Sequence, residues 1–181
     1  ISMNTISKKT GLFFGLVLAF YYVVVNVIAF FYDATLFTKS VFGIFNMLVV
    51  LILGILCVWI TRKKMGNELT FKNGFSAYLV MICIGFLANQ LTIYLLFNFV
   101  SPEFKEINNQ LMLDLAQANL TAMDLTQQEI DEKMAAARSI DNFALKNLLF
   151  SLAGSILRGS LAGLLIALIF KNKSEFVAPK P

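Results

Sequence analysis

The sequence predicts an all-α integral membrane protein with four transmembrane helices and an extramembrane helical hairpin between the third and the fourth. The first reason is composition, because 58% of the 181 residues are hydrophobic and only 14% are charged, whereas an average soluble domain is about 25% charged. The second reason is that the apolar residues gather in four runs, each long enough to cross a bilayer as a helix. These runs are continuously apolar, unlike the alternating strands of a membrane β-barrel.

The four predicted crossings are about residues 11–31, 41–60, 75–100 and 145–170. A helix rises about 1.5 Å per residue, so about 20 residues span the hydrocarbon core. The third run is slightly long, and we expect it to tilt or to extend beyond the bilayer. The crossings and the hairpin, at about 101–144, form one domain over residues 1–181.

Basic residues in the short connections predict the orientation. They precede the first crossing, separate the second from the third and follow the fourth: Lys8, Lys9, Arg62, Lys63, Lys64, Lys72, Lys171, Lys173 and Lys180. The opposite side has a long segment, 101–146, in which acidic residues outnumber basic ones. Because cytoplasmic loops are enriched in lysine and arginine, we expect both termini in the cytoplasm and the acidic segment outside.

Two amphipathic helices are predicted in the acidic segment. Ser101, Pro102 and Glu103 are typical of a helix start, and Thr126 with Glu129 matches a capping box. Apolar residues at helical spacing share one face: Phe104, Ile107, Leu111, Leu115, Ile130 and Met134. This face either pairs the two helices with each other or docks a partner. The second helix either ends before the fourth crossing or runs on into it.

Small residues recur every four positions in the fourth crossing: Ser151, Ser155, Gly159, Gly163 and Ala167. Such a stripe lets two helices approach closely in lipid, where packing drives association. The stripe includes a GxxxG match at Gly159 and Gly163. The partner is either another helix of the same chain or a second copy of the chain.

Arg158 is the most unusual residue, because it lies inside the fourth apolar run. A charge at mid-depth costs about 2.5–3.5 kcal/mol on insertion scales. Amides at similar depth on other crossings can accept hydrogen bonds from it, and they are Asn26, Asn46, Asn89 and Gln90. Asp33 is the nearest plausible carboxylate. Arg158 is therefore a buried arginine satisfied by amides, a binding group for a lipid or another anion, or a side chain that snorkels to the interface.

Enzymatic chemistry finds no support in the sequence. There is no histidine, and no catalytic or nucleotide-binding motif is present. The acidic group Asp124, Glu129, Asp131 and Glu132 lacks the spacing of a calcium-binding loop, so we expect no metal site. Cys57 and Cys83 lie in apolar runs and are expected to be buried thiols. We expect no enzyme activity, no cofactor and no nucleic-acid binding.

Three stretches carry a resemblance to a known family. They are Leu69-Thr70-Phe71-Lys72-Asn73-Gly74-Phe75 at the third crossing's start, Tyr94-Leu95-Leu96-Phe97-Asn98-Phe99-Val100-Ser101-Pro102-Glu103-Phe104 at its exit, and Thr126-Gln127-Gln128-Glu129-Ile130-Asp131, followed by the glycine-rich last helix. The sequence resembles the bacterial membrane family catalogued as domain of unknown function 4199. The resemblance implies a four-helix protein of the bacterial inner membrane and no particular activity.

Two functional hypotheses follow. The first is a non-enzymatic structural or partner-binding protein that self-associates and uses a periplasmic hairpin as its interaction surface. Its partners are membrane lipids, a second copy, or a periplasmic or membrane protein. The alternative is a small dimeric transporter, or a lipid- or anion-binding membrane protein, that uses Arg158 and the amides around it.

Overall fold

The computed structural model describes residues 4–123 and 125–172, and within these residues it contains helices and no strand. Asp124, Lys173 and Lys180 lie outside the described residues. The helices are α1 (Thr5–Asp33), α2 (Ser40–Lys64), α3 (Phe71–Leu95), α4 (Pro102–Thr121), α5 (Gln127–Arg138) and α6 (Leu145–Phe170), with a short 3-10 helix η1 (Ala34–Thr38) and a π-helical turn η2 (Leu96–Val100). The predicted all-helical fold is confirmed.

Four helical segments are long and apolar enough to cross a membrane, as predicted: Thr5–Thr38, Ser40–Lys64, Phe71–Val100 and Leu145–Phe170. The first three extend beyond the predicted apolar runs. The N-cap of α2 makes no side-chain hydrogen bond, and this helix is longer because Arg62, Lys63 and Lys64 form its last turn, whereas α1 and α3 begin at capping side chains. The Asn4 side chain accepts from the Ile6 amide at the start of α1, and the Thr70 side chain accepts from the Asn73 amide at the start of α3. A side-chain acceptor at the N-cap lets a helix begin several residues before its apolar part.

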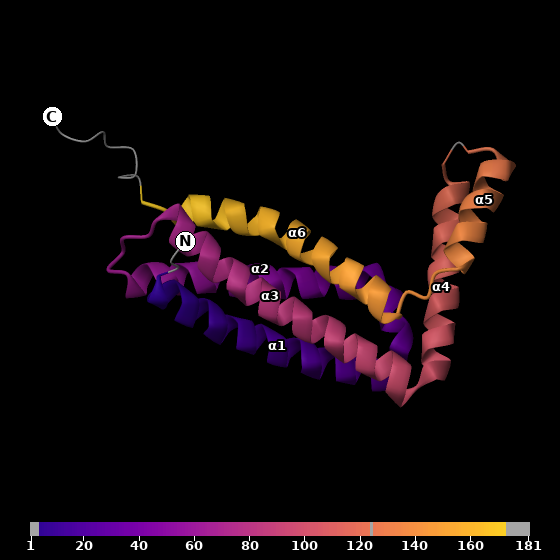
Figure 1. Ribbon diagram of the computed structural model, residues 1–181, viewed down its shortest axis with the longest axis horizontal. Coiled ribbons are helices and arrows are strands. Elements are labelled where there is room, and N and C mark those ends of the chain that lie inside the picture. Colours follow the sequence, from indigo (N-terminus) through magenta and orange to yellow (C-terminus); the bar gives the residue numbers. More distant parts are fainter. Residues whose placement is uncertain (1–3, 124, 173–181) are drawn as a thin grey trace.

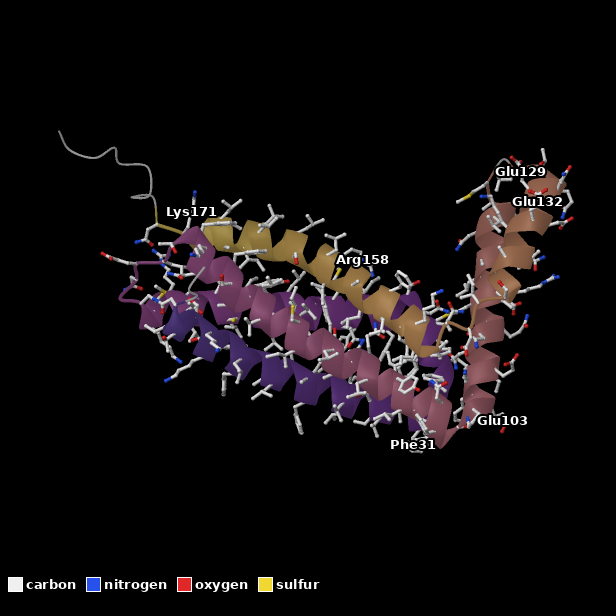
Figure 2. All side chains as sticks on the ribbon, viewed as in Figure 1. Phe31, Glu103, Glu129, Glu132, Arg158 and Lys171 are labelled. Carbon is white, nitrogen blue, oxygen red and sulfur yellow. The ribbon has the colours of Figure 1, made fainter. Side chains whose placement is uncertain are left out.

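The four long helices lie side by side, and α3 packs against α1, α2 and α6 (Figure 1). The start of α1 and the end of α6 lie at one end of the bundle (Figure 1). At this end the Asn172 amide donates to the Leu69 carbonyl at 3.0 Å, which ties the end of α6 to the α2–α3 connection. We call it the Lys171 end and the opposite one the α4 end, because α4 lies across it (Figure 2).

Glycines bring the helices together toward the Lys171 end. A Cβ at Gly11 of α1 would lie 2.5 Å from the Ala77 carbonyl of α3. The Tyr78 ring of α3 is fully buried and lies with one edge against Gly54 of α2 and the other against Gly163 of α6. Only glycine leaves room for that ring, so Tyr78 fixes the distance between α2, α3 and α6.

Aromatic packing holds α4 across the α4 end. The Phe30 ring of α1 contacts Phe97 of η2 at 5.1 Å and Phe104 of α4 at 5.4 Å between ring centroids. Phe97 also stacks on Phe143, before α6, at 4.2 Å. Burial of such rings, together with their edge-to-face contacts, stabilises the junction.

A polar network pins the α5–α6 connection to α4. Lys105 Nζ lies 2.6 Å from Asp141 Oδ2 and donates to Asn98 Oδ1 at 3.0 Å, while Asn109 donates to Asp141 Oδ1 at 3.2 Å. Partial burial alone would raise the pKa of Asp141, but hydrogen bonds from Lys105, Asn109 and the Phe143 amide outweigh it and hold the pKa below its usual value. The network fixes the carboxylate in its charged form.

The two helices between the third and fourth crossings run antiparallel and pack together (Figure 1). The predicted capping box at the start of α5 is present, with Thr126 and Glu129 bonded reciprocally, and hydrogen bonds from Thr126 lower the pKa of Glu129. Ser101 occupies the N-cap of α4, but its side chain makes no capping hydrogen bond. The alternative of a helix continuous with the fourth crossing is wrong, because α5 ends at Arg138 and α6 begins at Leu145.

Candidate functional site

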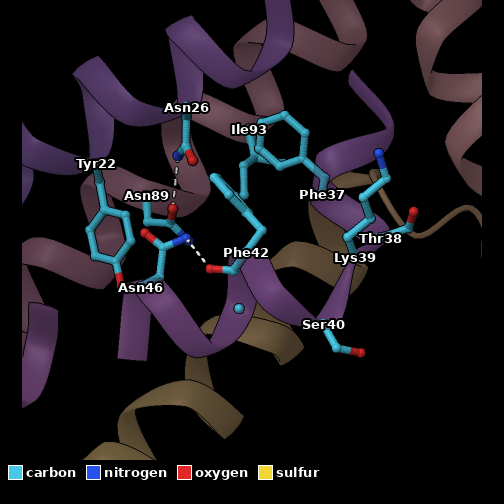
Figure 3. Close-up of a pocket in the computed structure, with 11 residues that line it drawn as sticks. Tyr22, Asn26, Phe37, Thr38, Lys39, Ser40, Phe42, Asn46, Asn89 and Ile93 are labelled. Carbon is cyan, nitrogen blue, oxygen red and sulfur yellow. Dashed lines mark hydrogen bonds between the residues drawn. The ribbon is translucent and has the colours of Figure 1, made fainter. Parts of the chain in front are cut away.

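Two adjoining cavities lie between the helices, and they share Tyr22, Gly43, Asn46 and Asn89. One, which we call the Asn26 cavity, has a volume of about 390 Å³ and lies beside η1 and the start of α2 (Figure 3). The other, which we call the Arg158 cavity, has a volume of about 570 Å³. The shared residues make them two compartments of one cleft, in the size range of ligand sites.

The Arg158 cavity is walled by three helices and by Tyr22 of α1. The residues that line it, besides the four shared ones, are Met47, Val50 and Leu51 of α2, Tyr78, Phe86 and Gln90 of α3, and Ser155, Arg158, Gly159 and Ala162 of α6. Most of this wall is apolar, and the polar groups are few. This combination is typical of a site for a molecule with both apolar and polar parts.

All five residues predicted to form a ligand or lipid site line this cleft. Arg158 and Gln90 line the Arg158 cavity, Asn26 lines the Asn26 cavity, and Asn46 and Asn89 line both. The chain thus brings together, from four helices, the residues that the sequence singled out. Whether they bind a ligand is a separate question.

The four amides bond to other groups and not to the arginine, so the expected arginine satisfied by amides is not what the structure shows. Asn26 donates to Asn89 Oδ1 at 2.8 Å, and Asn46 accepts from the Tyr21 hydroxyl at 2.9 Å while donating to the Phe42 carbonyl at 2.8 Å. Figure 3 shows the Asn26–Asn89 and Asn46–Phe42 bonds. The Asn26–Asn89 bond joins α1 to α3, whereas the Asn46–Phe42 bond lies within α2.

Arg158 lies at the rim of its cavity and is exposed. Among the described residues it makes one hydrogen bond, from Nη2 to Ser155 Oγ on the same helix, at 3.4 Å. A Cβ at Gly154 would lie 3.3 Å from Nη1, so the side chain runs along α6 toward the α4 end, the usual direction for a long helical side chain. Within residues 4–123 and 125–172 no carboxylate pairs with it, and Asp33 pairs with Lys39 instead, at 2.8 Å.

Two residues that line the Arg158 cavity each have a buried polar atom without a hydrogen-bond partner in the part of the chain that the structure describes. The atoms are the Tyr78 hydroxyl and Gln90 Oε1. The Gln90 amide nitrogen donates one of its two N–H groups to Ser151 Oγ at 3.2 Å. Tyr78 was not predicted as a site residue, because a tyrosine in an apolar run is ordinarily a core residue. Its position between Gly54 and Gly163 depends on contacts between distant segments.

The small-residue stripe of α6 faces α3. A Cβ at Gly159 would lie 3.1 Å from the Phe86 ring, and Gly163 lies against Tyr78. Ala167 is buried, Ser151 accepts from Gln90, and Ser155 lines the Arg158 cavity. Part of the stripe therefore packs within the chain, and part borders the cleft.

The predicted partner surface is divided between packing and exposure. Phe104 packs on Phe30, and Met134 is buried. Ile107 and Leu115 are 44% and 50% exposed. Leu111 and Ile130 are half-buried. Ile107 and Leu111, with Glu106 and Gln110, line a groove of about 370 Å³.

The fold and the cleft define an all-helical protein with four candidate membrane-spanning helices and a polar group of residues between them. The described residues contain no group of three or more histidine, cysteine or acidic side chains placed to hold a metal, and Cys57 and Cys83 are free thiols.

The chain belongs to the family described as "Protein of unknown function (DUF4199)", whose model matches residues 9–172. The resemblance noted in the sequence is therefore confirmed. No curated protein and no solved structure matches the chain.

Proposed function

We propose that this protein binds an acidic amphiphile, without enzymatic chemistry, in the cleft around Arg158. It does so in the bacterial inner membrane, with both termini cytoplasmic and α4 and α5 outside. The observation that carries the proposal is the position of Arg158, an arginine with no carboxylate partner among the described residues, at the rim of a mostly apolar cavity between spanning helices. This proposal favours the ligand-binding alternative over a purely structural role.

The distribution of charge supports the orientation. Arg62, Lys63 and Lys64 form the last turn of α2, and Lys171, which follows α6, lies at the same end of the bundle (Figure 2). Glu103, Glu129 and Glu132 lie at or beyond the opposite end (Figure 2). Lysine and arginine enrichment marks the cytoplasmic side of short loops, so the α4 end is the periplasmic one.

The energetics of Arg158 favour an acidic ligand. A guanidinium in hydrocarbon costs about 2.5–3.5 kcal/mol even on insertion scales, and one long bond to Ser155 leaves most of its five donors without a protein acceptor. An acidic group offsets this cost through charge-assisted hydrogen bonds. The apolar wall formed by Met47, Val50 and Phe86 suits the hydrocarbon part of the same molecule.

The ligand reaches the site from the bilayer. Met47 of α2 is 55% exposed, Arg158 of α6 is exposed, and both line the Arg158 cavity. Because α2 and α6 are spanning helices, a surface exposed between them in the membrane faces lipid. An amphiphile can therefore enter sideways between these two helices without crossing the bundle.

Lipid retention tests the role of Arg158. The purified protein, delipidated in detergent, is titrated with short-chain phosphatidylmethanol, a simple acidic lipid, and with phosphatidylcholine, and bound lipid is counted by native mass spectrometry. We expect wild type to prefer the acidic lipid and Arg158→Met to lose at least tenfold in affinity for it. Lys146→Met is the matched control, because it removes a cation from the same helix outside the cavity. Equal affinity of wild type and Arg158→Met for phosphatidylmethanol would overturn the proposal.

Partner binding through α4 and α5 is a second candidate function. It is favoured by the exposure of Ile107 and Leu115 on one face of α4. The partner with the simplest test is a second copy of the chain. If α4 mediates self-association, Ile107→Ser with Leu115→Ser will convert a dimer to a monomer by light scattering in detergent. A monomeric wild type removes this candidate.

A further inference from the structure

The Arg158 cavity offers an acceptor as well as a cation, and this sets a second requirement on the ligand. Gln90 Oε1 is buried and has no hydrogen-bond partner, although it lines the same cavity as Arg158. The Gln90 nitrogen is held by Ser151 of α6. That bond orients the amide, and no described residue donates to its oxygen.

Donors are also available next to this acceptor. Asn89, the neighbour of Gln90 on α3, uses its oxygen to accept from Asn26 at 2.8 Å. Its amide nitrogen has no hydrogen bond to any other described residue, and Asn89 lines the Arg158 cavity too. Arg158 and Asn89 therefore present N–H donors, and Gln90 presents an acceptor without a partner among the described residues, from two helices around one space.

We infer that the head group of the bound amphiphile carries a hydrogen-bond donor, a hydroxyl or an amine, in addition to its acidic group. The inference rests on the proposed function. Arg158 and Asn89 donate to the acidic oxygens, and Gln90 Oε1 accepts from the hydroxyl or amine. An acidic group alone leaves Gln90 Oε1 unsatisfied when the ligand excludes water, and an unsatisfied buried acceptor is costly. A site built to pair a polar group discriminates against an analogue that lacks it.

Two phospholipids of equal charge test this requirement. Phosphatidylglycerol and phosphatidylmethanol are both phosphodiesters with one negative charge, and only the first has hydroxyl donors on its head group. With matched acyl chains, we expect wild type to bind phosphatidylglycerol about tenfold more tightly, the size of effect given by one hydrogen bond to a buried acceptor. Affinities are measured by titration in native mass spectrometry.

Variants test whether Gln90 causes the preference for phosphatidylglycerol over phosphatidylmethanol. Gln90→Leu is expected to bind the two lipids with equal affinity, because it lacks the acceptor that distinguishes them. Ser151→Ala removes the hydrogen bond that orients the amide and leaves Oε1 itself present, so we expect a preference between those of wild type and Gln90→Leu. If Gln90→Leu fails to fold, the wild-type ratio and the Ser151→Ala ratio still decide.

The outcomes separate this inference from the proposed function. Equal binding of the two lipids by wild type, with loss of both in Arg158→Met, overturns the donor requirement and leaves the acidic-amphiphile site standing. Undiminished binding of both lipids by Arg158→Met overturns the proposed function itself. A third probe is glycerophosphoglycerol, the water-soluble head group without acyl chains. If it binds as tightly as phosphatidylglycerol, the ligand comes from water and its assignment as a lipid is wrong.

Discussion

Replacing Gly54 by alanine tests the packing that closes the bundle toward the Lys171 end. The added methyl group would clash with Tyr78 Cε2 and lie 3.0 Å from Cδ2. The ring cannot retreat, because Tyr78 is fully buried and its other edge lies against Gly163. The substitution therefore forces α2 away from α3 or the tyrosine out of its rotamer.

The expected loss in the free energy of unfolding is the cost of the added methyl group minus the gain in helix propensity. Inserting a methyl group into a packed core costs about 1–3 kcal/mol, and alanine gains about 1 kcal/mol over glycine in a helix. Because the Tyr78 ring is held on both sides, we take the upper end of the packing cost. The net loss in the free energy of unfolding is then about 2 kcal/mol. For a chain of this size that lowers the Tm by about 4–8 °C.

Thermal unfolding in detergent measures this loss. In a Cys83→Ser background, which removes the partly buried second thiol, a thiol-reactive dye reports it, because Cys57 is fully buried and reacts only when the bundle opens. Gly43→Ala is the control on the same helix, since a Cβ at Gly43 meets nothing within 4 Å; its Tm should stay unchanged or rise slightly. If the Tm of Gly54→Ala equals or exceeds that of Gly43→Ala, α2 and α3 do not approach as described.

Three further perturbations have defined outcomes. Asn89→Leu removes the acceptor of the Asn26 amide, which is 1% exposed, and should lower the free energy of unfolding by about 1–3 kcal/mol in the same dye assay. The double variant with Asn26→Leu should recover most of this loss. If it recovers none, Asn26 and Asn89 are not paired as described. Thr126→Ala removes the capping box, which is worth about 1 kcal/mol to α5. Hydrogen exchange should therefore quicken at the Glu129 and Ile130 amides, which bond to Thr126, with no change in Tm. Asp141→Asn should lower the Tm at neutral pH. The lowered pKa of Asp141 means that its contribution is present above its unfolded pKa and is lost as the pH falls through the folded one. The difference between wild type and Asp141→Asn should therefore disappear in strong acid, and a difference that persists there would assign the effect to packing.

The helices could be predicted because hydropathy and local capping act over short distances. The fourth crossing was predicted at 145–170, and α6 spans Leu145–Phe170. The other crossings were predicted too short because their polar ends are not apolar enough to be counted, although caps such as Asn4 and Thr70 keep them helical. The way α4 lies across the bundle depends on Phe30, Phe97 and Phe143 meeting from three distant segments, which no local pattern reveals.

The members of the cleft could be predicted, but not their bonding. Arg158, Asn46 and Gln90 are rare polar residues in apolar runs, and burial in lipid makes such residues gather inside a bundle. Which of them pair depends on helix rotation and depth. Asn26 therefore bonds with Asn89 and leaves Arg158 without an amide acceptor, an outcome that residue type and spacing alone do not determine.

The two halves of the bundle differ in what fills the space between helices, and this difference favours binding over passage. Toward the Lys171 end, Gly54 and Gly163 close on the Tyr78 ring, and Gly11 lies against the Ala77 backbone. Toward the α4 end, amides and Arg158 line a cleft whose volumes are about 390 and 570 Å³. A continuous pathway would require the Tyr78 ring to leave a slot that is closed on both sides. A ligand that enters from lipid needs no such movement, so the geometry fits a site that holds an amphiphile better than a channel.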